Sequence, residues 1–238
     1  MGQKFARKKR RNIINSIIYK LSKFIWASER SKFTFFANLD WIFNRLAHES
    51  WMTMYADKEQ HPQRERMYAF ICDKLPDDAV VLDIGCGYGE ISDMLGKVCK
   101  SVTGIDLSRS KLQHALDHYS SGNVNFICGD AVVFLNENRQ HYDVLICSHV
   151  LEHLDDPSGM LRSFKDYYSY IYIEVPDFDN SYINHVRQRL NIPLNYTDED
   201  HVWEYDRNEM EMLITSLNMK IEHVEFSNGV MRYWVKVE

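Results

Sequence analysis

Residues Val80–Gly89, V-V-L-D-I-G-C-G-Y-G, predict how the chain around them folds. Their first half is a run of aliphatic, mostly β-branched residues, which is typical of a strand buried on both faces. Gly85, Gly87 and Gly89 then turn the chain, and residues 90–97 are able to begin a helix. Because glycine has no Cβ atom, backbone N–H groups in such a turn can approach a ligand closely. The stretch therefore predicts a nucleotide-type binding site at the carboxyl end of a parallel strand.

Two families of nucleotide-binding proteins use a turn of this kind. A dinucleotide-binding dehydrogenase needs G-x-G-x-x-G, and here Glu90 stands where the third glycine would be. The order D-x-G-C-G-x-G, with Asp83 inside the strand end, instead resembles the first motif of class I S-adenosylmethionine (SAM)-dependent methyltransferases. A dehydrogenase is therefore the weaker interpretation.

Length and composition favour one soluble α/β domain with some extra structure. The 238 residues are 45% hydrophobic and 26% charged, which is ordinary for a globular protein. The net charge of -6 is unevenly distributed, because residues 1–32 carry a local charge of +9 and residues 33–238 carry -15. Any attraction to phosphate groups is therefore expected of the amino-terminal arm.

The cysteines and the apolar runs bear on the cellular compartment. Five cysteines without C-x-x-C spacing are typical of a reduced intracellular protein that has no cysteine metal site. No apolar run approaches the roughly 18 residues of a membrane span, and polar residues interrupt the start of the chain, unlike a secretory signal. We expect a cytoplasmic protein, with residues 1–32 as the candidate for peripheral attachment to a membrane.

Residues 1–32 predict a basic amphipathic helix. A basic cluster, Arg7–Arg11, precedes apolar residues that share one helical face, namely Ile13, Ile14, Ile17, Ile18, Leu21, Phe24 and Ile25. Such a helix is typical of segments that lie flat on an anionic bilayer. Packing of the same face on the protein itself or on a partner subunit is an equal alternative, and an Arg-rich mitochondrial presequence is a third.

The remaining chain, 33–238, predicts one domain in which strands and helices alternate. Residues 33–75 are expected to form an aromatic-rich helical cap that precedes a core of residues 76–238. The alternating pattern places strands near 79–84, 101–106, 123–128, 142–147 and 169–175, and helices near 89–97, 108–118, 131–137 and 158–167. A helix near 207–217 and strands at 220–226 and 230–237 follow, with the hairpin signal Ser227-Asn228-Gly229 between the strands.

This order of elements resembles the fold of class I methyltransferases. That fold is a Rossmann-like α/β architecture with a mostly parallel seven-stranded sheet, whose antiparallel last strand comes from a C-terminal hairpin. The resemblance predicts the same sheet here, with additional helices at the amino terminus.

Acidic and small residues at the ends of successive strands extend the resemblance. Asp106 ends the second strand, 21 residues after Gly85, where a carboxylate can accept hydrogen bonds from both ribose hydroxyls of a nucleotide. Gly129-Asp130-Ala131 resembles the methyltransferase contact to the adenine amino group, and Ser148-His149 ends the fourth strand beside the expected sulfonium. The resemblance implies that SAM binds Asp83, Gly85, Cys86, Gly87, Gly89, Asp106, Leu107, Asp130, Ala131, Ser148 and His149.

Histidines near these strand ends are candidates for the general base that a hydroxyl acceptor needs. His149 is placed best because it ends a strand, whereas His153 fits a structural role in the Leu-Glu-His turn. His201 lies in a stretch, 176–206, for which the minimal fold has no place. Its segment D-H-V-W-E-Y resembles the H-x-x-E-[YF] segment of bacterial glycan and lipid-intermediate methyltransferases, so His201 is expected to act as base, substrate ligand or loop anchor.

A metal site is an alternative role for the same histidines. The segment V-L-E-H-L-D-D-P, 150–157, resembles type 11 and type 12 methyltransferase domains. Ubiquinone-pathway and small-RNA methyltransferases carry E-x-x-E-H at this turn and can hold a divalent metal there; the corresponding residues here are His149-x-x-Glu152-His153. Residues three and four apart share a helical face, and His201 is able to complete the set. Leu-Glu-His also occurs in family members that need no metal, so the use of a metal stays open.

The function expected from these motifs is O-methylation of a small molecule, a sugar or polysaccharide, or a lipid-linked intermediate. No N-P-P-[YF]-like motif follows the fourth strand, which argues against methylation of a base nitrogen. An RNA 2′-O-methyltransferase is the runner-up because the basic arm suits RNA, although its apolar stripe favours a membrane or a protein over nucleic acid. A non-catalytic SAM-fold protein is the rival from another class, and the retained Asp83, Asp106 and Asp130 count against it.

Overall fold

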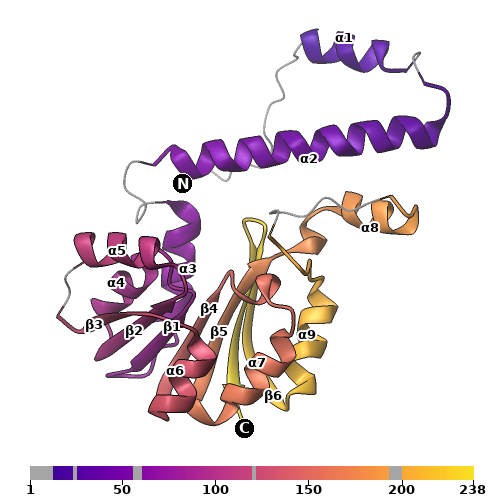
Figure 1. Ribbon diagram of the computed structural model, residues 1–238. Coiled ribbons are helices and arrows are strands. Elements are labelled where there is room, and N and C mark those ends of the chain that lie inside the picture. Colours follow the sequence, from indigo (N-terminus) through magenta and orange to yellow (C-terminus); the bar gives the residue numbers. More distant parts are fainter. Residues whose placement is uncertain (1–12, 24–25, 56–60, 120–121, 193–199) are drawn as a thin grey trace, which may run out of the picture.

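A seven-stranded sheet forms the centre of the protein in the computed structural model, which describes residues 13–23, 26–55, 61–119, 122–192 and 200–238 (Figure 1). The strand order is β3-β2-β1-β4-β5-β7-β6; β1 to β5 are parallel, and β7 pairs antiparallel with both β5 and β6. This arrangement confirms the class I methyltransferase sheet. The strands are β1 (Val80–Ile84), β2 (Ser101–Asp106), β3 (Val124–Cys128), β4 (Tyr142–Ser148), β5 (Tyr168–Pro176), β6 (Met219–Ser227) and β7 (Val230–Val237).

Helices cover both faces of the sheet. On one face α3 (Pro62–Cys72) and α4 (Glu90–Gly96) pack on strand residues such as Val81 and Val144. On the other face α6 (Ala131–Asn138), α7 (Pro157–Phe164) and α9 (Arg207–Ser216) pack on strand residues such as Leu82 and Leu145. Successive strand residues therefore point to opposite faces and are buried on both, as the aliphatic run in β1 predicted.

The connecting helices begin where the sequence predicted them, because their capping residues are local signals. Helix α5 (Arg109–His118) starts after Ser108, whose hydroxyl accepts a hydrogen bond from the Lys111 backbone N–H. Helix α9 starts with a capping box between Asp206 and Glu209. The expected helix 158–167 is shorter than predicted, since α7 ends at Phe164 and a 3₁₀ turn, Lys165–Tyr167, continues to β5.

The C-terminal hairpin turns at Asn228 and Gly229, which have φ angles of 56° and 81°. Two consecutive residues with positive φ are what an Asn-Gly turn of type I′ requires. The turn places β7 between β5 and β6 and brings Asn228 to the open end of the sheet, where the parallel strands end.

The amino-terminal region is helical, as predicted for 33–75, and includes one long helix. Helix α2 (Glu29–Thr53) lies across the open end of the sheet, together with the shorter α8 (Tyr182–Arg189) (Figure 1). The two helices are linked by the Arg30 guanidinium, which donates to the Leu190 carbonyl at 2.6 Å, and by Arg187, which donates to Asn38 at 3.0 Å. The expected division at residues 32 and 33 falls inside α2 and stays a prediction.

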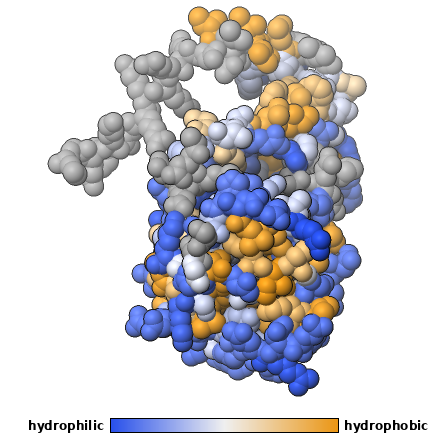
Figure 2. All heavy atoms as spheres, turned by 60° about the vertical axis from the view of Figure 1, so that its left-hand side comes forward, coloured by the Kyte–Doolittle hydropathy of each residue, from blue (hydrophilic) through white to orange (hydrophobic). Residues whose placement is uncertain are grey.

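Helix α1 (Ile13–Leu21) is part of the predicted amphipathic segment and exposes its apolar side chains. Ile13, Ile17, Ile18 and Leu21 are each more than half exposed, and they form the hydrophobic patch at the top of Figure 2. The basic cluster Arg7–Arg11 and the apolar residues Phe24 and Ile25 lie outside the described residues. In the part of the chain that the structure describes, no helix is both long and apolar enough to span a bilayer.

Candidate active site

The glycine turn after β1 combines two different requirements. Gly87 has a φ of 55°, and the nearest atom to a Cβ built there is the Gly85 carbonyl oxygen, at 4.0 Å. That side of the turn is open, and Gly87 borders the cavity described below. At Gly89 a Cβ would come within 2.7 Å of the Phe126 ring. Gly87 therefore leaves space at the site, whereas Gly89 allows the turn to pack closely against β3 and Ala115 of α5.

Asp83, the acid of the predicted motif, is buried at the end of β1 rather than open to the cavity. Its carboxylate accepts a hydrogen bond from the Ser92 hydroxyl on α4 at 2.6 Å. Burial raises the pKa of Asp83 to about 7, and the Ser92 hydrogen bond opposes this rise. Asp83 thus links β1 to α4 beneath the glycine turn.

Asp106 ends β2, and Asp130 directly precedes α6, as predicted. The Asp106 carboxylate accepts hydrogen bonds from the backbone N–H groups of Gly87 at 2.9 Å and Ser108 at 2.7 Å. Asp130 caps α6 through Oδ1, which accepts from the N–H groups of Val132 and Val133. Both carboxylates are therefore held by backbone groups. Leu107 and Ala131 follow them at the same edge of the sheet, and the Leu107 side chain is exposed.

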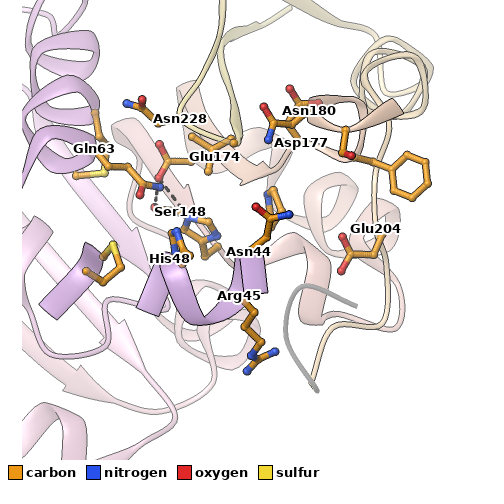
Figure 3. A pocket seen from close by; sticks show the side chains of 18 of the residues that line it. Asn44, Arg45, His48, Gln63, Ser148, Glu174, Asp177, Asn180, Glu204 and Asn228 are labelled. Carbon is orange, nitrogen blue, oxygen red and sulfur yellow. Dashed lines mark hydrogen bonds and ion pairs between the residues drawn. The ribbon is translucent and has the colours of Figure 1, made fainter. Parts of the chain in front are cut away.

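A cavity of about 940 Å³ lies at the carboxyl ends of the central strands, beneath α2 and α8 (Figure 3). Its floor includes five of the residues predicted to bind the cofactor: Gly85, Cys86, Gly87, Ser148 and His149. Asp83, Gly89, Asp106, Leu107, Asp130 and Ala131 do not border it. The structure therefore brings the β1 turn and the end of β4 together at one cavity, with the β2 and β3 residues beside it.

His149 lies between two buried carboxylates at the end of β4. Its Nδ1 is 3.0 Å from Glu152 Oε1, and its Nε2 is 3.4 Å from Glu174 Oε1. Burial by itself would lower the pKa of His149, but hydrogen bonds to Glu152 and Glu174 outweigh it and raise the pKa to about 10. His149 is therefore an imidazolium at neutral pH. Because an imidazolium cannot accept a proton, this geometry does not support the base role expected for His149.

Glu174 on β5 connects His149 to a charge network that the sequence did not predict. Its Oε2 accepts from the Tyr172 hydroxyl at 2.8 Å and pairs with Arg232 Nε at 2.5 Å. Burial alone would raise the pKa of Glu174, but His149 and Arg232 lower it to about 2. Arg232 is fully buried and also contacts Glu225 at 3.0 Å. These residues are distant in sequence and belong to no motif, so only the sheet pairing reveals them.

His201, the other expected base, is held outside the cavity. Its Nδ1 is 3.1 Å from Glu204 Oε1, and its side chain is only 6% exposed. Glu204 borders the cavity, whereas His201 does not. The His201 ring packs edge-on against His153, with ring centroids 4.8 Å apart. The contacts place His201 as a neighbour of the Leu-Glu-His turn.

Glu152, His153 and His201 form a group whose donor atoms all lie within 4.8 Å of one another. Glu152 Oε2 is buried without a hydrogen-bond partner among the described residues. Two imidazoles and a carboxylate are a donor set that suits zinc and other divalent transition metals. The structure thus brings together three of the four residues in the metal alternative, while His149 contacts Glu152 from the other side.

The roof of the cavity carries functional groups that sequence reasoning missed. Asn44 and His48 come from α2, Asn180 from the segment after β5, and Asn228 from the hairpin turn, and Figure 3 shows their side chains around the cavity. His48 lies in the segment 33–75, for which the sequence predicted only an aromatic-rich helical cap, and carboxamides in loops carry no motif. Their helical or loop spacing alone does not indicate which of them face a cavity, because that depends on where α2 lies over the sheet.

Comparison with known proteins agrees with this geometry. A family model described as a methyltransferase domain matches residues 55–224. Among curated relatives, a ubiquinone biosynthesis O-methyltransferase of Coxiella burnetii is 38% identical over 85 residues, and that match covers 35% of this chain and 36% of the relative. A protein of the same name from Shewanella pealeana is 34% identical over 90 residues. The chain thus matches only about a third of the length of these relatives.

Solved structures share the fold over most of the chain. The magnesium protoporphyrin IX methyltransferase of Synechocystis PCC 6803, solved with bound S-adenosylhomocysteine (SAH), has a TM-score of 0.58 at 16% identity and covers 82% of this chain and 96% of its own. A SAM-dependent methyltransferase from Archaeoglobus fulgidus has a TM-score of 0.52 at 18% identity, with coverages of 73% and 94%. With the family model matched over most of the sheet and its helices, the chain belongs to the methyltransferase-domain family and has the class I methyltransferase fold.

Proposed function

We propose that this protein transfers the methyl group of SAM to a hydroxyl oxygen of a small molecule, a sugar or polysaccharide, or a lipid-linked intermediate. One observation carries the proposal: a single cavity extends from the glycine turn after β1 to a polar roof on α2 and the β6–β7 turn. The family membership supports methyl transfer, and the name of the ubiquinone-pathway relatives supports an oxygen acceptor.

Residues at the floor of the cavity, together with the β2 and β3 ends beside it, suit SAM. Gly87 leaves open space beside its backbone, and the Asp106 carboxylate, held by the Gly87 N–H, is an acceptor for ribose hydroxyls. Asp130 Oδ2 has no donor among the described residues, because both helix-capping bonds go to Oδ1. We therefore assign Asp106 to the ribose, Asp130 to the adenine amino group, and Ser148 to the methyl-donor end. SAM supplies a methyl carbon that its sulfonium has already activated.

The roof of the cavity favours an acceptor rich in hydroxyl groups. Asn44, Asn180 and Asn228 present carboxamides that have no hydrogen-bond partner among the described residues, and each can both donate to and accept from a hydroxyl. Trp41 and Tyr182 add aromatic surface to the same lining. Neutral polar groups beside aromatic rings suit a sugar or a polyhydroxylated ring. This composition supports a glycan or a glycan-bearing lipid as acceptor.

An RNA acceptor is less favoured by the charge of the same lining. The cavity is bordered by five carboxylates and three arginines; the carboxylates are Asp40, Glu90, Glu174, Asp177 and Glu204. With the protonated His149 the lining holds nearly as many positive groups as carboxylates, so it has no excess of positive charge for the phosphodiester backbone that supplies most of the affinity for nucleic acid. The exposed apolar face of α1, together with the basic residues of the arm, instead supports attachment to an anionic membrane surface.

Transfer of labelled methyl groups tests the proposed function. Purified protein is incubated with methyl-labelled SAM and with separate fractions of cell extract: polar lipids, polysaccharides, small molecules and RNA. We expect label in the lipid or glycan fraction. Mild alkali cleaves methyl esters, so the label should stay bound after treatment with mild alkali. Parallel reactions with a chelator and with added Zn²⁺ or Mn²⁺ decide whether the group of Glu152, His153 and His201 is used. Label confined to RNA, or to no fraction at all, would contradict the proposal.

A further inference from the structure

Helix α2 presents one stripe of residues to the cavity. Ala37, Trp41, Asn44, His48 and Met52 all border it, and their spacing of three and four places them on one face of the helix. The opposite face is apolar and exposed, with Phe35, Ile42 and Leu46 each more than 40% exposed. The polar side chains Asn44 and His48 thus face the cavity from the inner side of α2, while apolar residues are exposed on its outer side. The polar groups on that stripe are therefore candidates for contact with a ligand in the cavity.

His48 is the titratable side chain of that stripe at the methyl-donor end. Its imidazole borders the same cavity as Ser148 and His149 (Figure 3), and it is near enough to His149 for the two side chains to interact electrostatically. The Trp51 ring packs edge-on against the imidazole, with centroids 6.0 Å apart, and so restricts its orientation. Neither ring nitrogen of His48 has a hydrogen-bond partner among the described residues. The nitrogens are therefore available to a ligand in the cavity.

We propose that His48 is the general base of the methyl transfer, a role that rests on the proposed function of the cavity. A base must lie at the acceptor, must have a free ring nitrogen, and must be neutral at the working pH. His48 has the position and the free nitrogens. His149 contacts two carboxylates and His201 lies outside the lining, so neither of the histidines expected from the sequence meets these conditions.

The surroundings of His48 favour the neutral form of its imidazole. Burial lowers the pKa of His48 below its ordinary value of 6.5, the positive charge of His149 lowers it further, and Glu49 on α2 opposes both. The other charged groups facing this part of the cavity are Arg64 of α3, which is paired with Glu90 at 2.7 Å, and Glu174, which is paired with Arg232. His61, the N-cap residue of α3, also has a lowered pKa because it is buried.

The proton and the bonds balance around this residue. As the acceptor oxygen bonds to the methyl carbon, the carbon–sulfur bond breaks and its electron pair returns to sulfur, which leaves a neutral thioether. The proton of the acceptor hydroxyl passes to a ring nitrogen of His48 and then to solvent. One positive charge is lost at sulfur and one is gained at His48, so the charge of the cavity is unchanged during the step.

Replacement of His48 by Gln tests the assignment in the extract fraction that accepts label. We expect His48→Gln to lower the rate constant for transfer by about 100-fold or more, which is the contribution typical of a positioned base. The affinity for SAH, measured by calorimetry, should change by less than twofold. His223→Gln, on the exposed side of β6, is the matched control and should keep the wild-type rate. A His48→Gln protein that transfers methyl groups at the wild-type rate, or that loses SAH affinity in parallel, overturns the assignment.

Titration of the imidazoles by nuclear magnetic resonance provides a readout that needs no acceptor. The His48 signal, assigned by its loss in His48→Gln, should titrate below the ordinary pH of 6.5, because burial lowers the pKa of this imidazole. A His48 midpoint above pH 7 overturns the assignment even where no acceptor is known. Absence of transfer by the wild-type protein with every fraction instead contradicts the proposed function, so the two failures are distinguishable.

Discussion

The buried carboxyl group of Asp83 makes the stability of the fold depend on pH. Its pKa in the folded protein is about 7, well above the ordinary value of 3.8, chiefly because of burial. An acid with a raised folded-state pKa contributes full stability below the unfolded-state value, near pH 4, and loses it as the pH rises through about 7. Above pH 7 the folded protein therefore holds a carboxylate that burial disfavours.

Asp83→Asn should remove this pH dependence, because the amide is neutral at every pH and can still accept the Ser92 hydrogen bond. The unfolding free energies of the variant and the wild type should be similar near pH 4. The variant should become the more stable protein by about 4 kcal/mol at pH 8, since each unit of pKa shift corresponds to about 1.4 kcal/mol. Urea unfolding at several pH values measures the difference. A difference that does not change with pH would show that Asp83 is ionised without cost.

At the level of elements, the hairpin between β6 and β7 depends on its backbone conformation. Gly229 has a φ of 81°, in the left-handed region, which costs an L-residue with a Cβ roughly 1–2 kcal/mol. Space does not limit the site, because the nearest atom to a Cβ there is Asn180 Nδ2 at 3.7 Å.

Gly229→Ala should therefore lower the free energy of unfolding by roughly 1–2 kcal/mol through backbone strain alone. Asn228→Gly is the matched control; it should stay within about 0.5 kcal/mol of the wild type, because glycine tolerates the positive φ of 56° at that position. The free energies of unfolding of the two variants are compared from their urea midpoints, with one common dependence of free energy on urea concentration. Equal effects of both substitutions would contradict the strain explanation.

The elements that the sequence predicted well are those specified by neighbouring residues. The strand and helix positions, the Asn-Gly turn and the glycine motif all depend on patterns within about ten residues, and they agree with the structure. The Glu174–Arg232 pair depends on the pairing of β5 with β7, and the position of His48 depends on where α2 lies over the sheet. Such contacts are set by the tertiary fold, so no local pattern predicted them. The base roles expected for His149 and His201 rested on strand ends and motif likeness without knowledge of these partners.

At the level of the whole molecule, exposed apolar side chains gather on the amino-terminal helices. The α1 residues Ile13, Ile17 and Ile18 and the outer face of α2 are exposed, and α2 also forms the roof of the cavity. A protein attached to a membrane through these helices would hold its cavity close to lipid-linked acceptors. Each basic residue near an anionic leaflet contributes about 1 kcal/mol of attraction, which salt screens.

We therefore expect the full-length protein to sediment with vesicles of phosphatidylcholine and phosphatidylglycerol, and to be released by salt. Ile17→Glu combined with Ile18→Glu should abolish sedimentation, because both side chains are exposed on α1. Val133→Glu, at a similarly exposed apolar position on α6, is the control and should leave sedimentation unchanged. If the wild-type protein does not sediment with the vesicles, membrane attachment is contradicted, and the apolar face of α1 is instead a surface for contact with protein.

Calorimetric titration of the protein with SAM tests the cofactor site on which the proposed function depends. The wild-type protein should bind one SAM per chain and should give no heat with nicotinamide cofactors. Asp106→Ala should weaken SAM binding by roughly 1–3 kcal/mol, the cost of losing hydrogen bonds to a charged group, while the control Asp117→Ala on the exposed face of α5 should not. Unchanged SAM affinity in Asp106→Ala, or no binding by the wild type, would contradict a SAM site at the carboxyl ends of β1 and β2.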